Sequence, residues 1–263
     1  MDKSRPHGSS TIQCVADADA LYDAAAALFA QAAVESVRAA GAFTVALAGG
    51  STPKRLYSRL AADPVLRTQV PWDKVHFFWG DERHVPPDHP ESNFRAAHEA
   101  MLSRLPVDWA RVCRMKGEYP DACTAADEYE ENLRAVFQLE RGQLPRLDLV
   151  LLGLGPDGHT ASLFPGTLAL VERRRLCVSN WVGKLSEDRI TLTVPVFNNA
   201  SFVLFLVQGA EKARALKAVL DKRFEPEQLP ANLIQPRSGR VLWLVDRAAA
   251  NLLATAAARD PVP

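Results

Sequence analysis

The feature that most constrains this chain is a unit that occurs three times: a short apolar segment that runs directly into a glycine-containing turn. The apolar segments and their turns are Phe43 to Ala48 before Gly49-Gly50-Ser51-Thr52-Pro53, Val75 to Trp79 before Gly80-Asp81-Glu82-Arg83, and Leu147 to Leu152 before Gly153. Helical spacing of apolar residues follows the first two turns, through Leu56, Tyr57 and Leu60 and from about Ser92 to Leu102. The unit is therefore strand, glycine turn, helix.

Other segments extend the same alternation. An Ala-rich helix is predicted from Asp17 to Ala40, ending at Gly41. Further predicted elements are strands at Leu176 to Ser179, Ile190 to Val194, Phe202 to Val207 and Val241 to Val245, and helices from Ala210 to Leu220 and from Arg247 to Ala257. The Pro-bearing stretch Phe224 to Arg237 is predicted to be a surface connection.

Apolar strands without polar alternation indicate a sheet that is covered on both faces. The predicted fold class is α/β, a three-layer α/β/α arrangement with a mainly parallel sheet. Right-handed crossovers bring the carboxyl ends of parallel strands to one edge, where ligands bind in such sheets. The three glycine turns should therefore converge.

Composition limits the partners. The 263 residues are 48% hydrophobic, enough to bury one core, and we expect a single domain over residues 11–263 behind a disordered polar tail at residues 1–10. The 31 basic and 31 acidic residues cancel, which argues against binding to nucleic acid or to an anionic membrane. Four scattered cysteines, no signal peptide and no membrane-spanning stretch favour a reducing cytoplasm.

The first turn suits an anion. Gly49 and Gly50 let phosphate oxygens approach backbone N–H groups at a helix start, and Ser51 and Thr52 add hydroxyl donors. Thr52 is also a candidate helix cap, with Pro53 as the first helical residue, and a well-made cap is the simpler interpretation of the motif taken alone. The spacing of a Walker loop is missing.

The second turn carries ionisable groups directly after a strand. Arg83 suits an anionic oxygen because its planar guanidinium donates paired hydrogen bonds, and Asp81 is a candidate for substrate binding. In isolation, a solvated charged loop is the more common explanation of such residues.

The third turn runs from Gly153 through Gly155, Asp157 and Gly158 to His159. It matches the glycine spacing of a dinucleotide site, but Asp157 would lie beside a pyrophosphate and Pro165 would cut short the required helix. A His next to an Asp fits acid–base catalysis better, because imidazole titrates near neutrality and a carboxylate can orient it. His159 is the candidate base, although a lone histidine is more often structural.

The sequence gives little evidence for a serine nucleophile or a catalytic metal. The sequence contains no GxSxG elbow and no HExxH motif, and the remaining histidines lack metal-ligand spacing. We expect neither a metal nor a cofactor.

Five segments carry a family resemblance. They are Leu47 to Pro53, Trp79 to Arg83, Gly153 to Pro165, Arg189 to Thr193 with Pro195, and Gln235-Pro236 with the strand at 241–245. In order and content they resemble the signature segments of 6-phosphogluconolactonases, over nearly the whole chain from about Ile12. The resemblance implies a fold shared with glucosamine-6-phosphate deaminases and ribose-5-phosphate isomerases, and a hydrolase of the oxidative pentose phosphate pathway that acts on a sugar-phosphate lactone.

The resemblance also suggests roles for individual residues. Lys184 matches a family lysine that precedes the Arg189 strand, but the prolines often found between them are replaced by Leu185 to Asp188. Gly155 and Gly158 are assigned to the substrate site, and the phosphate is expected at Gly49 to Thr52 with help from Arg83, Lys184 or Arg189.

Two alternatives stay open. In the deaminases an Asn-Glu-Pro segment follows the Asp-Gly-His turn, and its place here is taken by Leu163-Phe164-Pro165, which favours the lactonase. A sugar-phosphate sensor without catalysis would have no need of His159. Whether Asp157 orients His159 or binds a sugar hydroxyl is left undecided, and we expect a monomer or a weak homodimer.

Overall fold

Six parallel strands form the central sheet, in the order β1-β9-β8-β5-β2-β3. The computed structural model describes residues 10–221, 225 and 228–253 of the 263. The strands are β1 Ser10–Val15, β2 Phe43–Leu47, β3 Val75–Trp79, β5 Leu149–Leu152, β8 Phe202–Val207 and β9 Arg240–Asp246. Every strand pair in this sheet is parallel, which confirms the predicted sheet type.

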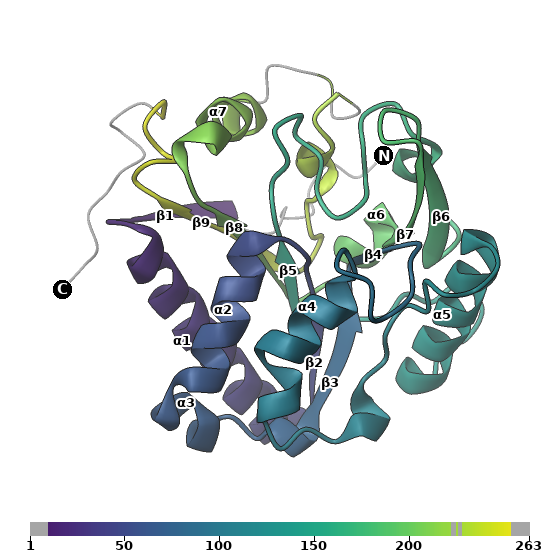
Figure 1. The fold of residues 1–263 in the computed structure, drawn as a ribbon, viewed down its shortest axis with the longest axis horizontal. Coiled ribbons are helices and arrows are strands. Elements are labelled where there is room, and N and C mark those ends of the chain that lie inside the picture. Colours follow the sequence, from purple (N-terminus) through teal and green to yellow (C-terminus); the bar gives the residue numbers. More distant parts are fainter. Residues whose placement is uncertain (1–9, 222–224, 226–227, 254–263) are drawn as a thin grey trace.

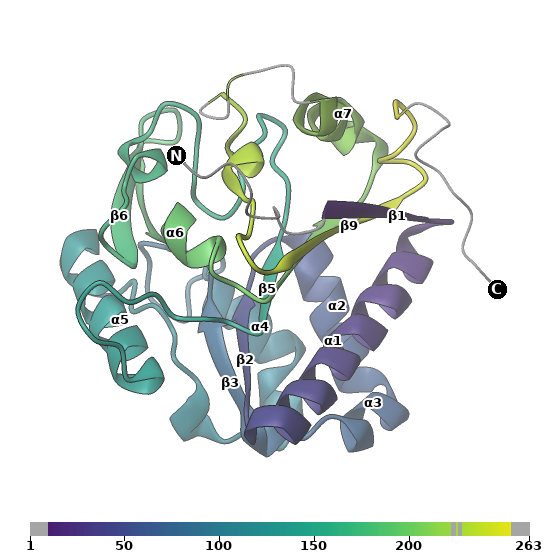
Figure 2. The ribbon, with the colours of Figure 1, turned by 180° about the vertical axis from the view of Figure 1, so that it is seen from behind.

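Helices cover both faces of the sheet (Figures 1 and 2). The first four, which pack against one face, are α1 Ala18–Ala40, α2 Ser51–Ala62, α3 Pro64–Gln69 and α4 Asn93–Ala100. On the other face lie α5 Ala122–Phe137, α6 Val194–Phe197 and α7 Ala213–Asp221. The short 3-10 helices are at Trp72–Lys74, Leu102–Arg104, Trp109–Arg111, Leu168–Leu170, Ala210–Lys212 and Pro230–Leu233. The three-layer α/β/α prediction is confirmed.

Strand β8 shows why the strands of the central sheet are continuous apolar segments in the sequence. Phe202, Leu204 and Leu206 pack into the core under α1 and α2. Val203, Phe205 and Val207 point to the opposite core, and all six residues of the strand are buried. Because successive side chains alternate between two buried faces, neither face tolerates a polar residue.

A second, three-stranded sheet lies on the α5 side. It consists of β4 Asp81–Arg83, β7 Glu187–Leu192 and β6 Cys177–Val182, in the antiparallel order β4-β7-β6. The sequence placed strands near β6 and β7 but treated residues 81–83 as a loop, because three charged residues in a row have low strand propensity. Pairing with β7 overrides that propensity.

The structure differs from the sequence prediction at several other points. Residues Arg247 to Leu253 form turns, so the start of the expected C-terminal helix is wrong, and residues 254–257 lie outside the described residues. Ser10, which was assigned to the polar tail, begins the edge strand β1, while residues 1–9 are also outside. Of the expected surface connection, Pro230, Ala231 and Asn232 are buried.

Helix α5 was not predicted, although its signals are present. The side chain of Asp121 caps it by accepting a hydrogen bond from the Thr124 N–H. Its buried positions Ala122, Ala125, Ala126, Tyr129 and Leu133 follow helical spacing. Among the described residues, no helix is long and apolar enough to cross a bilayer.

Two buried tyrosines fasten the backbone where strands end. The Tyr57 hydroxyl accepts a hydrogen bond from the Ala48 N–H at 2.9 Å and donates one to the Ala48 carbonyl at 2.7 Å. The Tyr129 hydroxyl makes the same pair of bonds with Trp79, at 2.8 and 3.1 Å. Burial raises the pKa of both phenols, so both stay protonated and able to donate. These tyrosines therefore hold β2 and β3 at the residues that precede the first two glycine turns.

We predict that Tyr57→Phe lowers the free energy of unfolding by about 1–3 kcal/mol, because it leaves the buried N–H and carbonyl of Ala48 without partners. Chemical denaturation followed by circular dichroism measures this change. Tyr119→Phe is the matched control, since the Tyr119 hydroxyl makes no hydrogen bond to another described residue. Equal stability of Tyr57→Phe and the control would contradict the fastening role.

Candidate functional site

The three glycine turns line one cleft of about 330 Å³ at the carboxyl edge of the central sheet. The predicted site residues that line it are Gly49, Gly50, Ser51, Thr52, Asp81, Arg83, Gly155 and His159. The expected convergence of the turns is therefore confirmed. It follows from the parallel order of β2, β3 and β5, which brings their carboxyl ends to the same edge.

The first turn leads into a helix start without a side-chain cap. Gly50 is the N-cap residue with a φ of 101°, which favours glycine, and α2 begins at Ser51. The expectation that Thr52 caps the helix is wrong, because Thr52 and Pro53 both lie inside its first turn. The N–H groups at this end are thus not bonded to a capping side chain and can donate hydrogen bonds to an anion.

Asp81 and Glu82 of the second turn are buried, so this turn is not the solvated charged loop that the sequence also allowed. Asp81 accepts a hydrogen bond from the Ser162 hydroxyl at 2.6 Å. Glu82 is only 2% exposed and accepts hydrogen bonds from the backbone N–H groups of Arg83, Asn93 and Phe94. Burial raises the pKa of Glu82, and the three N–H donors oppose that rise. Glu82 thereby ties β4 to the start of α4.

Arg83 has an incompletely bonded guanidinium at the cleft. Its Nη1 donates to the Glu91 carbonyl at 3.1 Å, while its Nε is buried and has no hydrogen-bond partner within the described residues. Because Arg83 lines the cleft, its guanidinium charge would stabilise an anionic oxygen there.

In the third turn, Asp157 and His159 form a pair. One carboxylate oxygen of Asp157 lies 2.5 Å from Nδ1 of His159 and accepts the His159 N–H at 3.2 Å. Partial burial raises the pKa of Asp157, but the hydrogen bonds from His159 and Lys184 outweigh burial and hold it well below the ordinary value. Because an ionised carboxylate only accepts, Nδ1 is the nitrogen that donates to Asp157, and in the neutral imidazole Nε2 is then the nitrogen with the free lone pair.

The glycines of this turn make room for the pair. A Cβ on Gly155 would lie 2.0 Å from Nδ1 of His159, so no side chain fits there. Gly158 has a φ of 77°, and a Cβ on it would lie 2.6 Å from the side chain of Leu229. Gly158 therefore shapes the turn without lining the cleft.

Lys184 and Arg189 lie near the cleft but do not line it. Lys184 binds the second carboxylate oxygen of Asp157. Arg189 pairs with Arg83 across β4 and β7 and binds Glu187 at 2.6 Å. Burial and the nearby Arg83 lower the pKa of Arg189, and its Nε is also buried without a partner among the described residues.

Sequence reasoning missed part of the lining. Asn93, Gln208 and Lys212 also line the cleft. A Cβ on Gly49 would lie 1.8 Å from the amide oxygen of Asn93, so the first turn packs directly on this side chain. Gln208 comes directly after β8, and Lys212 comes after the turn at Gly209, whose φ is 95°. The rule used for the other three strands, applied to β8, would have found them.

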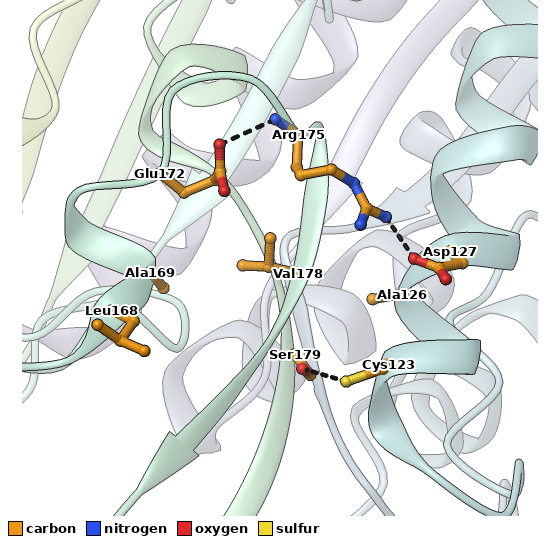
Figure 3. Close-up of a pocket in the computed structure, with 9 residues that line it drawn as sticks. All are labelled: Cys123, Ala126, Asp127, Leu168, Ala169, Glu172, Arg175, Val178 and Ser179. Atoms are coloured by element: carbon orange, nitrogen blue, oxygen red, sulfur yellow. Dashed lines mark hydrogen bonds and ion pairs between the residues drawn. The ribbon is translucent and has the colours of Figure 1, made fainter.

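A second cavity, of about 220 Å³, lies beside β6 and α5 (Figure 3). Its polar groups are bonded to one another: Arg175 binds Asp127, Glu172 accepts the Arg175 N–H at 3.1 Å, and Cys123 lies 3.0 Å from the hydroxyl of Ser179. None of the predicted site residues lines it. No group of three or more His, Cys, Asp or Glu side chains in the described part of the chain could hold a metal ion.

Comparison with known proteins agrees with this geometry. Residues 16–243 match the family model described as glucosamine-6-phosphate isomerases/6-phosphogluconolactonase. A 6-phosphogluconolactonase from Synechocystis sp. is 46% identical over 210 residues, which is 80% of this chain and 84% of that protein. The solved 6-phosphogluconolactonase from Trypanosoma cruzi is 30% identical, with a TM-score of 0.81 over 94% of this chain and 99% of that one.

A monomeric glucosamine-6-phosphate deaminase of known structure is 21% identical to this chain in sequence. It superimposes with a TM-score of 0.76 over 92% of this chain and 99% of that chain, which shows the shared fold alone.

The depressed pKa of Asp157 makes a prediction about stability. A carboxyl whose pKa is lower in the folded state stabilises the protein at pH values above about 3.9, the ordinary carboxyl pKa, and that stabilisation is lost as the pH falls further. Asp157→Asn should therefore be less stable than the wild type at pH 7, and the difference should shrink below about pH 4. Thermal unfolding at several pH values measures it, with Asp88→Asn, an exposed carboxylate, as the control. A difference independent of pH would contradict this assignment.

Proposed function

The chain belongs to the glucosamine-6-phosphate isomerase/6-phosphogluconolactonase family, and from that premise we propose how its cleft hydrolyses a sugar-phosphate lactone. The chain is an enzyme of the lactonase type, a hydrolase of the pentose phosphate pathway. The proposed reaction converts 6-phospho-D-glucono-1,5-lactone to 6-phospho-D-gluconate. No step of this reaction needs a redox change, because a water molecule adds to an ester carbonyl and the ring C–O bond breaks.

The observation that carries the proposal is that His159 and the anion-suited turn at Gly49 to Thr52 line one cleft. A lactone carbonyl is already electrophilic, so the enzyme has to deprotonate a water and stabilise the oxyanion that forms. His159 Nε2, with its free lone pair, takes the proton from the water and later returns it to the ring oxygen as the tetrahedral intermediate collapses. Asp157 holds the imidazole through Nδ1 and stabilises the imidazolium in between.

The phosphate is proposed to lie at the start of α2. Positive charge around one part of the cleft comes from the backbone N–H groups of Ser51 and Thr52, the helix dipole, the guanidinium of Arg83 and the ammonium of Lys212. Binding the phosphate there fixes the lactone ring so that its carbonyl meets the water beside His159. Of the other two cations, Lys184 is bound to Asp157, and Arg189 lies beside Arg83 on the neighbouring strand.

Replacing the proposed base gives the most direct test. His159→Ala should lower kcat by about 100- to 10,000-fold, the usual range for a general base, and should leave the affinity for 6-phosphogluconate nearly unchanged. A coupled assay with freshly generated lactone measures turnover after subtraction of spontaneous hydrolysis. Near-normal turnover in this variant, or ammonia release from glucosamine 6-phosphate by the wild type, would contradict the proposal.

The phosphate site predicts a different kinetic signature. Lys212→Met should raise KM about tenfold with a smaller effect on kcat, because it removes a contact made equally before and during the reaction. Lys217→Met is the control, since Lys217 lies on α7 and is paired with Asp221. An unchanged KM in Lys212→Met would place the phosphate elsewhere.

A further inference from the structure

The ring of Phe164 contacts both partners of Asp157. It stacks on the His159 imidazole with the ring centres 4.1 Å apart and an angle of 27° between the planes. The ammonium of Lys184 lies 4.7 Å from the centre of the same phenyl ring. Asp157 binds His159 and Lys184 through separate oxygens, so the carboxylate and the phenyl ring together hold the imidazole and the ammonium.

The position of Phe164 is set independently of His159. Its carbonyl accepts hydrogen bonds from the N–H and the hydroxyl of Thr167, at 3.2 and 2.7 Å. The buried amide of Asn180, on β6, donates to the Ser162 carbonyl and to the Thr167 hydroxyl. The Phe164 side chain is therefore carried by a turn that is fastened to β6, and Phe164 itself is only 6% exposed.

A single hydrogen bond cannot fix the plane of an imidazole. The bond from Nδ1 to Asp157 leaves the ring free to tilt about that contact, and a tilt moves Nε2 away from any water that it must deprotonate. A flat aromatic face packed against the imidazole removes this freedom, and the same face attracts the Lys184 ammonium through its π electrons. Orientation of a catalytic group on this scale decides rates, because misplacement by about 1 Å costs up to about 100-fold.

We propose that Phe164 is a positioning residue: its ring holds the His159 imidazole in the plane in which Nδ1 meets Asp157 and Nε2 faces the cleft, and keeps Lys184 on the other oxygen of Asp157. This inference rests on the proposed role of His159 as the base. Phe164 belongs to the Leu163-Phe164-Pro165 segment, which takes the place of the carboxylate-bearing Asn-Glu-Pro segment of the deaminases.

The kinetic test compares ring-free and ring-bearing variants. Phe164→Leu and Phe164→Met should each lower kcat about 10- to 100-fold while KM changes little, because the proposed phosphate contacts are untouched. Phe164→Tyr, which keeps the ring, should recover most of the rate. Phe29→Leu is the matched control: it removes a fully buried ring that packs on Phe43 and Trp72 within the other core, and should lower stability without changing kcat.

A spectroscopic measurement tests the same idea without turnover. In the wild type, stacking predicts an upfield ring-current shift of the His159 ring protons, and the ¹⁵N spectrum should show one form with the proton on Nδ1. In Phe164→Leu or Phe164→Met the upfield shift should vanish, while the proton should stay on Nδ1 because the bond to Asp157 is kept. Because the wild-type spectrum needs no substitution, the test holds even if both ring-free variants fail to fold.

The outcomes separate the two proposals. If the wild type hydrolyses the lactone and His159→Ala does not, but the ring-free variants keep the wild-type kcat, the positioning role of Phe164 is wrong and the base stands. The positioning role is equally wrong if the His159 ring protons of the wild type show no ring-current shift. If His159→Ala keeps its turnover, the proposed base fails, whatever the spectra show about the ring.

Discussion

Burial of a parallel sheet on both faces is the constraint on which the rest of this structure depends. With helices packed on each side, strands such as β8 carry only apolar residues and have no room for catalytic groups. Polar residues of the site must then lie beyond the ends of the strands, and parallel order brings the carboxyl ends of β2, β3, β5 and β8 to one edge. The cleft is a consequence of that order.

Loops at this edge are held by buried polar side chains that bond to their backbone. Tyr57 and Tyr129 fasten the last residues before the first two turns, and the hydroxyl of Thr160 donates to the Gly153 carbonyl at the third. At the end of β8, the carboxylate of Asp246 accepts the Gly209 N–H at 3.1 Å. Each such bond satisfies a backbone group that the core would otherwise leave unpaired, and it holds a residue that lines the cleft or lies close in the chain to one that does.

Charge in this neutral chain is concentrated locally. Arg83 and Arg189 lie side by side across β4 and β7, each with a buried N–H that lacks a partner within the described residues. Burial and the neighbouring like charge of Arg83 both disfavour the charged form of Arg189, and together they lower its pKa. A dianionic phosphate at the cleft would relieve that repulsion. Asp157, by contrast, is paired with the Lys184 ammonium and accepts a hydrogen bond from Nδ1 of His159, the proposed base.

The sequence alone determined the fold class, the convergence of three turns and eight of the residues that line the cleft, because hydrophobic period and glycine punctuation are local signals. It did not find β4, whose charged residues form a strand only because β7 offers a partner, nor the contributions of Asn93 and Lys212. The sequence also did not show which side chains of the loops meet. Lys184 binds Asp157 from a separate loop, and the Phe164 ring folds back onto His159 within one segment. Which side chains meet is set by the packing of whole elements, and no local pattern encodes the distance between two loops.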